Sequence, residues 1–429
     1  MKVESLILPD LKNNSPSLLN TFDSAASFFK SFSIFTSLIC AILSAGQIKV
    51  ATYNILNFPN SYGFQRLDDF RTVMDYLKPD VLLVQEMQSQ YGVNLFLDSV
   101  LNYKESKFSA CEFHDGPDTD NALFYRNDKI SFVNAIYLAT VNRDIAQYHL
   151  RIKDSQKELY LFSIHFKSGT GSDNELTRLQ EATILRTHLD TIANGREILV
   201  MGDFNFYYDE PAYKKLIDST EPGTGRLCDP IGIPGMWHEN SSFSYLHTQS
   251  TRNEDLPDGG AGGGLDDRFD LIFCTPSLLD TADLFLPRES YTVFGNDANH
   301  FNKSINSGIN QSVSDEVADA LYYASDHLPV YVQILDHYVS TGTQEPLVIY
   351  PNPIQEEARI VFPFYEDFRK ARITITNIAG QRMFEMTTTN PQGVTIRNKN
   401  MGVGVYFVHL EIETKYERKY HHCKMAVVK

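Results

Sequence analysis

In the stretch REILVMGDFNFYYDEP, Arg196–Pro211, an apolar segment gives way abruptly to polar residues. The run Ile198–Met201 is unbroken, which is typical of a short strand buried on both faces. Gly202 ends it, and Asp203 and Asn205 follow, two residues apart and therefore on one face of an extended chain. A turn explains this combination of residues equally well. The interpretation depends on whether other strands bring polar groups to the same edge.

Other apolar runs of the chain also begin or end in polar side chains. These are Asn54 in TYNIL, Glu86 in LLVQE, His165 in SIHFKSG, Asp270 in DDRFDLIF, and Asp326 and His327 in ASDHLPV. The runs alternate with helical patterns over residues 64–77 and 174–195. We therefore expect an α/β core over residues 47–338 with mixed sheets. Polar groups gathered at strand ends in a cleft must satisfy one another or a ligand.

The chemistry of these side chains points to a metal-assisted reaction. Glu86, Asp326 and Asn54 offer hard oxygen donors without a thiolate, which suits Mg²⁺ or Mn²⁺ better than Zn²⁺. Histidines without cysteine companions are better suited to proton transfer. A carboxylate beside an imidazole fixes its tautomer, so Asp270 and His327 would form a base that activates water.

Two further side chains can stabilise charge on a phosphoryl group. Asn205 can donate a hydrogen bond to a phosphoryl oxygen, and His165 can do so if it is protonated. The implied reaction is hydrolysis of a phosphoester by in-line attack of water with the help of a metal.

The motifs TYNIL, LLVQE, SIHFKSG, MGDFN, RFDLIF and SDHLPV, in this order, resemble the endonuclease/exonuclease/phosphatase superfamily. This superfamily includes deoxyribonuclease-type nucleases and neutral sphingomyelinases. The resemblance spans residues 48–335. It implies a four-layer α/β sandwich with two packed mixed β-sheets and a Mg²⁺ site.

The same resemblance implies a role for each residue. Asn54 and Glu86 would hold or orient the metal, and His327 would be the base paired with Asp270. Asp203 would orient the nucleophile or the leaving group, and Asn205 would bind the phosphate. His165 matches the deoxyribonuclease and sphingomyelinase branches, whereas abasic-site endonucleases carry tyrosine there. A base-repair role is therefore disfavoured.

The charge of the chain limits how it can hold a polyanion. The net charge is −16, and residues 47–344 contain 42 acidic and 23 basic residues, a net charge of −19. This charge argues against a protein held to nucleic acid by a broad basic surface. If the substrate is a phosphate ester, a bound cation must supply much of the local attraction.

Residues 1–46 are expected to be an export signal. The apolar stretch Ser33–Gln47 follows Lys30 and ends in small residues, and it is too short for an ordinary membrane span. The long preceding segment is consistent with a start codon placed too early. A buried helix is the alternative. No other segment is apolar enough to span a bilayer, and the four cysteines beyond the signal do not form a disulfide framework.

The end of the chain differs from the core. Residues 339–346 read as a polar linker, and residues 347–429 alternate apolar and polar residues, which predicts a small all-β domain, a β-sandwich. The motifs YPNP (Tyr350–Pro353), ITNIAGQ, GVGVYFVHL and KMAVVK resemble the sorting domain of Bacteroidetes type IX secretion cargo. This resemblance implies passage across the outer membrane and removal of the domain at the surface. A carbohydrate-binding module is the alternative.

The stretch GMWHENSSFSYLHTQSTR, Gly235–Arg252, could line the substrate cleft. Trp237 or Phe243 would then stack on a base and Arg252 would bind a phosphate. A loop that packs its aromatic side chains onto the sheet edge is equally consistent with the sequence. Lys167 could likewise bind substrate or be solvated.

The sequence thus favours a secreted, monomeric, Mg²⁺-dependent phosphodiesterase, foremost an extracellular nuclease acting on DNA or RNA. A sphingomyelinase-like phospholipase or a phosphoinositide phosphatase would use the same residues. A surface binding protein with a relict site is a third hypothesis, and the complete set of polar residues counts against it.

Overall fold

The computed structural model describes residues 47–207, 209–218, 223–233, 235–279, 284–336, 347–350, 352–362, 368–377, 381–391, 393–398, 401–415 and 418–428. The predicted export signal (residues 1–46) and linker (residues 339–346) lie outside these ranges.

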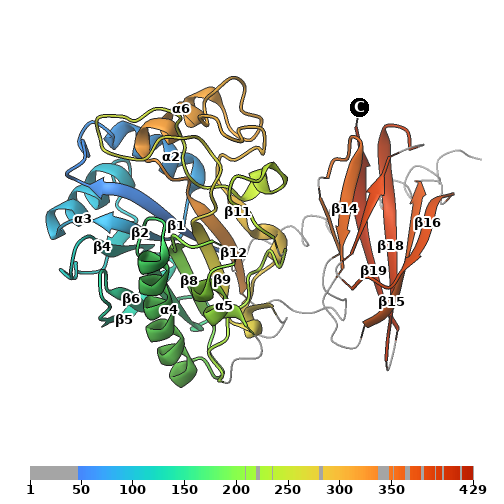
Figure 1. Cartoon of the computed structure of the whole chain (residues 1–429), viewed down its shortest axis with the longest axis horizontal. Helices are drawn as coiled ribbons and strands as arrows, with labels where there is room; N and C mark the ends of the chain where they lie inside the picture. The colour runs from blue at the N-terminus through green and yellow to red at the C-terminus, as the bar shows by residue number, and fades with distance from the viewer. Residues whose placement is uncertain are drawn as a thin grey trace, which may run out of the picture. The chain divides into compact units, whose positions relative to one another are not determined.

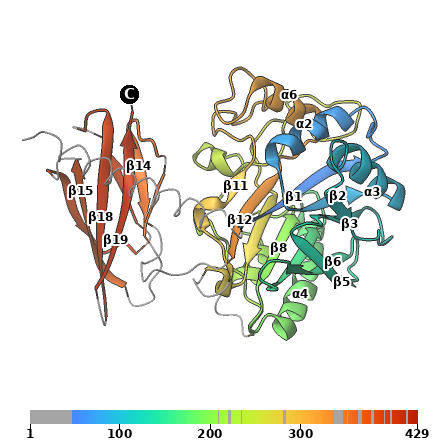
Figure 2. The same cartoon turned by 180° about the vertical axis from the view of Figure 1, so that it is seen from behind.

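Two β-sheets pack face to face within residues 47–336 (Figures 1 and 2). The first has the strand order β10-β12-β1-β2-β4-β3, with β11 paired to β12. Its strands are β1 (Gln47–Phe58), β2 (Val81–Met87), β3 (Phe108–Ala110), β4 (Asp120–Arg126), β10 (Leu284–Phe285), β11 (Thr292–Val293) and β12 (Val330–Asp336). The second has the order β5-β6-β7-β8-β9. Its strands are β5 (Ile130–Leu138), β6 (Ile145–Ile152), β7 (Glu158–His165), β8 (Ile198–Asp203) and β9 (Asp270–Cys274).

Helices cover the outer face of each sheet (Figure 1). On the first sheet lie α2 (Leu67–Leu77), α3 (Gln90–Phe96) and α6 (Asp315–Ala324), and on the second lie α4 (Ser172–Ile192) and α5 (Pro211–Ile217). Shorter helical turns span Leu97–Leu101, Ser241–Leu246, Pro276–Leu279 and Arg288–Ser290. The resulting helix–sheet–sheet–helix arrangement confirms the expected four-layer α/β sandwich.

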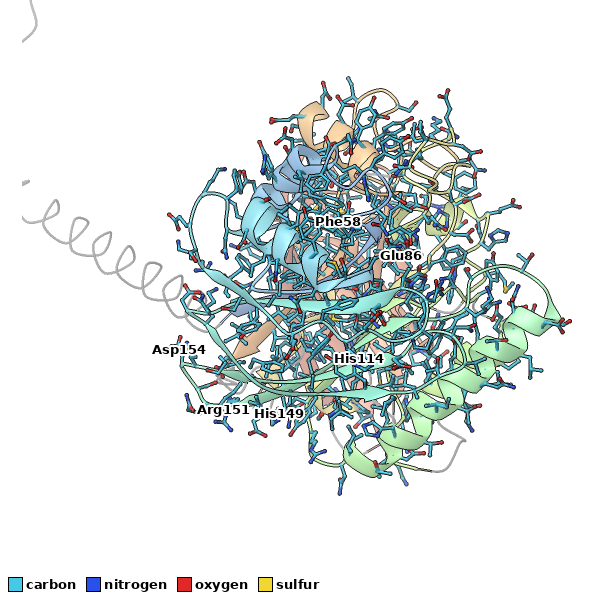
Figure 3. All side chains as sticks on the ribbon, turned by 90° about the vertical axis from the view of Figure 1, so that its left-hand side faces the viewer. Phe58, Glu86, His114, His149, Arg151 and Asp154 are labelled. Carbon is cyan, nitrogen blue, oxygen red and sulfur yellow. The ribbon has the colours of Figure 1, made fainter. Side chains whose placement is uncertain are left out.

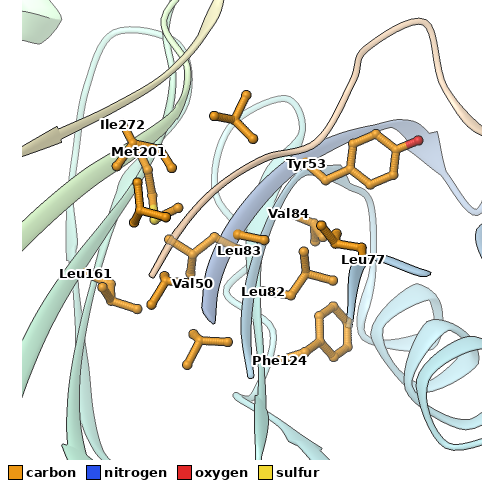
Figure 4. Close-up of a cluster of buried hydrophobic side chains, with 14 of the residues drawn as sticks. Val50, Tyr53, Leu77, Leu82, Leu83, Val84, Phe124, Leu161, Met201 and Ile272 are labelled. Atoms are coloured by element: carbon orange, nitrogen blue, oxygen red, sulfur yellow. The ribbon is translucent and has the colours of Figure 1, made fainter. Parts of the chain in front are cut away.

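Strand alternation builds the core between the sheets (Figure 4). Val50 and Leu83 of the first sheet face Leu161, Met201 and Ile272 of the second, and all five side chains are fully buried. Alternate residues of the same strands face the helices. Burying one such side chain stabilises the fold by roughly 1.5–3 kcal/mol. The continuous apolar runs seen in the sequence follow from this burial on both faces.

A chain of hydrogen bonds between side chains joins the two sheets at one end of this core. Thr52 Oγ1 donates to Gln85 Oε1 at 3.2 Å, and Gln85 Nε2 donates to Ser163 Oγ at 2.9 Å. Ser163 Oγ donates in turn to Asn121 Oδ1 at 2.7 Å. Buried polar groups satisfied in this way fix how the sheets align.

Residues 347–428 form two further sheets with a hydrophobic core of their own. One sheet contains β13 (Val348–Tyr350), β14 (Glu357–Val361) and β17 (Val394–Arg397). The other contains β15 (Phe368–Asn377), β16 (Arg382–Thr388), β18 (Gly404–Thr414) and β19 (Arg418–Val427). Their strand pairs are antiparallel, which confirms the all-β prediction made from the period-two pattern.

Gly202 lets β7 and β8 approach each other beside the site. Its φ of 139° is unfavourable for other residues, and a Cβ there would overlap the carbonyl oxygen of Ile164 on β7. Gly195 also has a positive φ, 70°, but a Cβ there would have no neighbour within 4 Å.

We therefore expect Gly202→Ala to lower the free energy of unfolding by about 3 kcal/mol or more, because strain and overlap add. The matched variant Gly195→Ala should cost only about 1 kcal/mol. Urea denaturation of both variants measures the difference. Equal losses in the two variants would show that the overlap with Ile164 adds no cost to the free energy of unfolding.

Candidate active site

One end of the second sheet presents three polar residues side by side. His165 ends β7, Asp203 ends β8 and Asp270 begins β9. In the strand register His165 pairs with Asp203, and Asp203 pairs with Asp270. All three are buried. The stretch quoted at the outset is therefore a strand end within a row of such ends and not an isolated turn.

His327 joins this row from the loop before β12. Its Nδ1 lies 2.7 Å from Asp270 Oδ2, and its Nε2 lies 3.7 Å from Asp203 Oδ2. Asp270 is held in turn, because its backbone N–H donates to Thr248 Oγ1 at 3.1 Å. The structure thus places the predicted base, its carboxylate partner and Asp203 in one cluster.

The first sheet contributes Asn54 and Glu86. Asn54 Nδ2 donates to Glu86 Oε1 at 3.0 Å and to Asp203 Oδ2 at 3.1 Å, so it bridges the sheets. Its Oδ1 accepts from the backbone N–H of Leu56 at 3.0 Å. Glu86 Oε2 accepts from the backbone N–H of Asn57 at 2.8 Å. In Figure 3 Glu86 lies beside Phe58 and far from Arg151 at the opposite end of the strands.

A break in the regular strand pairing directs Glu86 into the site. Gln85 already faces the second sheet, so strict alternation would turn Glu86 toward the helices. Glu86 instead has a φ of 65°, and the register of β1 with β2 shifts after Asn54. A positive φ outside glycine is uncommon and often marks a functional position.

His165 lies between the carboxylates of the two sheets. Its Nε2 is 3.8 Å from Glu86 Oε1 and 3.7 Å from Asp203 Oδ2. Burial, with the positive charges of Arg143, His327 and Lys167, holds the pKa of His165 well below its usual value. It is therefore neutral at physiological pH. A neutral imidazole can donate one hydrogen bond, and the donation from a protonated ring considered from sequence is disfavoured.

Asn205 lies next to Asp203, beyond the end of β8. Its φ is 52°, and its backbone N–H donates to Asp203 Oδ1 at 3.2 Å. Its Nδ2 donates to the carbonyl of Phe166 at 3.3 Å. The side chain is partly exposed. One N–H of the amide is therefore left to contact a ligand.

Asp326 is held by donors from two loops. Its Oδ2 accepts from the backbone N–H of Ala261 at 2.7 Å and from Gln249 Nε2 at 3.3 Å. Gln249 Nε2 also lies 2.7 Å from His327 Nε2. Sequence analysis did not select Gln249. It lies within the stretch Gly235–Arg252 that was expected to line the cleft, but glutamine there carried no signal of its own.

The comparisons with known proteins identify the family of the core. Residues 51–327 match the model of the endonuclease/exonuclease/phosphatase family. The chain belongs to this family. Its members are phosphoester hydrolases that generally depend on a divalent metal, and this chain is a hydrolase.

Residues 348–421 match a secretion-system C-terminal sorting domain. This match identifies the chain as cargo of type IX secretion, delivered to the cell surface or the medium. Within the described residues, no helix is long and apolar enough to cross a membrane.

Solved structures of similar fold include a family protein from Bacteroides thetaiotaomicron (18% identity, TM-score 0.45, 68% of this chain and 95% of that one). A second is a mannosyl-6-phosphatase from the same organism, with 18% identity and a TM-score of 0.44 over 67% of this chain and 99% of that one. A third is a truncated Caenorhabditis elegans TDP2, with 13% identity and a TM-score of 0.45 over 68% of this chain and 99% of that one. No curated protein sequence matches the chain.

The polar cluster at the strand ends carries excess negative charge. Burial raises the pKa of Asp203 to about 7, with His327 opposing the shift and Asp270 and Glu86 adding to it. Burial also raises the pKa of Glu86, although the hydrogen bond from Asn54 opposes this. For His327 burial alone would lower the pKa, but Asp270, Asp203 and Asp326 raise it well above its usual value.

These residues fit the divalent metal that the family uses. The donor set is made of oxygens, and the ion pairs of Glu86 and Asp203 among the described residues involve only histidines. The Glu86 side chain is 16% exposed, against 2% for Asp203. No cage of three or more His, Cys, Asp or Glu ligands exists within the described part of the chain. Glu86 is therefore the accessible carboxylate, and Asn54 orients it through the amide.

The predicted substrate contacts of Trp237 and Arg252 are wrong. Trp237 is 1% exposed, and it packs against Tyr213 and under the Arg268 guanidinium. Arg252 is fully buried, and its Nη1 binds Asp258 at 2.7 and 2.9 Å. The packing alternative holds for both, because their long side chains fill the space under the loop. Lys167 is partly exposed, so contact with substrate stays open to it.

The glycine-rich loop of residues 258–267 is tethered to the site. Ala261 binds Asp326, Asp258 binds Arg252, and a Cβ on Gly260 would approach within 3.0 Å of the Asp326 carboxyl carbon. The loop therefore lies against the cluster.

Asp203 should make the metal-free protein sensitive to pH. Its folded-state pKa of about 7 exceeds that of an unfolded aspartate, so the wild type loses stability as pH rises from about 4 to 7. In EDTA, Asp203→Asn should raise the free energy of unfolding at pH 8 by on the order of 2 kcal/mol.

Denaturant titrations between pH 4.5 and 8 measure this effect. Asp128→Asn is the control. Asp128 is an exposed carboxylate paired with Arg126, so removing its charge should not raise the free energy of unfolding. A difference between Asp203→Asn and wild type that stays constant with pH would contradict the buried, proton-binding carboxyl.

Proposed function

We propose that this chain is a secreted, Mg²⁺-dependent phosphodiesterase, foremost a nuclease that hydrolyses extracellular DNA or RNA. The observation that carries the proposal is the position of Asp203. Its Oδ2 lies 3.7 Å from the Nε2 atoms of both His165 and His327 and accepts a hydrogen bond from Asn54. A buried carboxyl between two imidazoles can orient both the attacking water and the leaving oxygen of an in-line displacement.

With the carboxylate charge around it offset by a bound metal, His327 would be neutral and would take the proton of the attacking water at Nε2. Asp270 holds the ring through Nδ1 at 2.7 Å and stabilises the imidazolium that forms. The attack makes a bond from water oxygen to phosphorus and breaks the bond to the leaving oxygen. Asp203, a carboxyl that is partly protonated near neutral pH, gives that oxygen its proton.

Asn205 and His165 bind the non-bridging oxygens of the phosphate. Each has one N–H to offer, and neither adds a positive charge. Glu86 would hold Mg²⁺, with Asn54 and Asp326 orienting the carboxylates around it, and Mn²⁺ would be the alternative ion. When bound, the metal offsets the carboxylate charge and polarises the phosphoryl oxygen.

The acidic core supports a nuclease that binds weakly and releases quickly. With a net charge of −19 over residues 47–344, few phosphates are neutralised by the protein. We propose that the chain acts as a monomer.

The alternative substrates, sphingomyelin and phosphoinositides, are favoured by one observation. Phe64 and Tyr91, 55% and 58% exposed, lie on the segments that follow β1 and β2 and can contact an acyl chain as well as a base.

The first test is the release of acid-soluble product from plasmid DNA and from RNA by the purified chain, with Mg²⁺ or with EDTA. Cleavage should require the metal. His327→Ala should lower the rate by about 10²–10⁴-fold, because the general base is lost. Glu86→Gln should raise the Mg²⁺ concentration needed for half-maximal rate.

His114→Ala is the matched control, since His114 Nε2 contacts Asp144 at 3.0 Å in a similar pair outside the site. It should keep full activity. A folded wild type that cleaves neither polymer would contradict the nuclease proposal and direct the assay to sphingomyelin and phosphoinositides. Inactivity there as well would leave a binding protein.

We propose further that the mature enzyme is the core alone. Residues 1–46 would be removed on export, and the β-sandwich of residues 347–429 would be cut off at the linker of residues 339–346. The intact mass of the protein recovered from the medium of a host with type IX secretion should correspond to a chain ending within that linker. A mass that includes the β-sandwich would contradict the removal.

A further inference from the structure

Gln249 contacts the two residues at the centre of the proposed reaction. Its Nε2 lies 2.7 Å from His327 Nε2 and 3.3 Å from Asp326 Oδ2. The first contact is made to the ring nitrogen that must take the proton from water. No role for this residue follows from the motifs of the family.

The neighbours of Gln249 determine which way its amide points. A carboxylate can only accept hydrogen bonds, so the amide group that faces Asp326 must be the NH₂. The same NH₂ group faces the Nε2 atom of His327. In the neutral ring that nitrogen accepts, and the proton resides on Nδ1, where it is donated to Asp270 at 2.7 Å. Contacts at both ring nitrogens specify the same tautomer.

The backbone fixes the origin of the Gln249 side chain. Its N–H donates to the carbonyl of Asp267 at 3.1 Å, and its carbonyl accepts from the N–H of Asp267 at 3.0 Å. On its other side it forms a β-bridge with His327. The residue is thus paired on both sides, between the segment that leads into β9 and the loop that carries the base.

We propose that Gln249 is a positioning residue that holds the imidazole of His327 in the tautomer able to accept a proton and ties it to Asp326. In the free enzyme the amide occupies the approach to Nε2. When the attacking water enters, it replaces the amide as the hydrogen-bond partner of Nε2, and the amide keeps its hydrogen bond to Asp326. This inference rests on the proposed function of the same site.

The test replaces the amide with a side chain of similar shape. Gln249→Met keeps the length of the side chain and removes both hydrogen bonds. With bis(4-nitrophenyl) phosphate and Mg²⁺, kcat should fall about 10–100-fold, the usual cost of losing a group that orients a site residue. The KM should stay unchanged, because Gln249 does not touch the substrate. Gln249→Asn, which is too short to reach both partners, should behave in the same way.

Gln147→Met is the matched control. Gln147 Oε1 lies 2.6 Å from His188 Nε2 between β6 and α4, so the variant also removes a contact between glutamine and histidine. It should keep kcat. Thermal unfolding of both variants separates a loss of fold from a loss of positioning. A Gln249→Met enzyme with kcat within twofold of wild type would overturn the proposal.

A second readout does not depend on activity. In the metal-free protein labelled with [¹⁵N]histidine, at a pH high enough to deprotonate the ring, the His327 signals, assigned from their absence in His327→Gln, should report an unprotonated Nε2 that shifts in Gln249→Met and not in Gln147→Met. An unshifted Nε2 would overturn the proposal. If the wild type hydrolyses no phosphoester at all, the proposed function fails, while this spectrum still decides the contact.

Discussion

The site depends on the burial of one carboxyl, that of Asp203, among groups from both sheets. Asn54 reaches it from the first sheet, and both histidines face its Oδ2. Burial raises its pKa to about 7, so the metal-free cluster carries a destabilising charge at neutral pH. The fold tolerates this because the surrounding apolar core and the paired strands supply far more stabilisation than one ion removes. A site that is unfavourable without a ligand is a site prepared to bind a cation.

The arrangement also explains why the polar residues come from so many segments. Parallel pairing of β7 with β8 sets His165 beside Asp203, and antiparallel pairing with β9 adds Asp270. The loops before β12 and around Gln249 then close the cluster from the other side. Each segment contributes one or two groups, and backbone pairing orients the groups that the strands carry.

Much of this was predictable because it is periodic or local. Apolar runs gave the strands, and a polar residue at the end of each run predicted a common edge. Strands β5 and β6 and helices α5 and α6 were not predicted, because their segments lack long apolar runs. Trp237 and Arg252 were misplaced for a different reason. Aromatic and basic residues in a loop look the same in sequence whether they face solvent or fill the core.

The sequence by itself determined the fold class, the identity of the polar groups and the export route, since these follow from patterning and from motif order. Only the tertiary structure decided which atoms meet. The contacts of Asn54 with Asp203 and of Gln249 with His327 join residues separated by tens to hundreds of positions along the chain. The positive φ of Glu86 is likewise a feature of the folded backbone. Side-chain direction at such places is set by packing and strand register across the sandwich, and no local pattern encodes it.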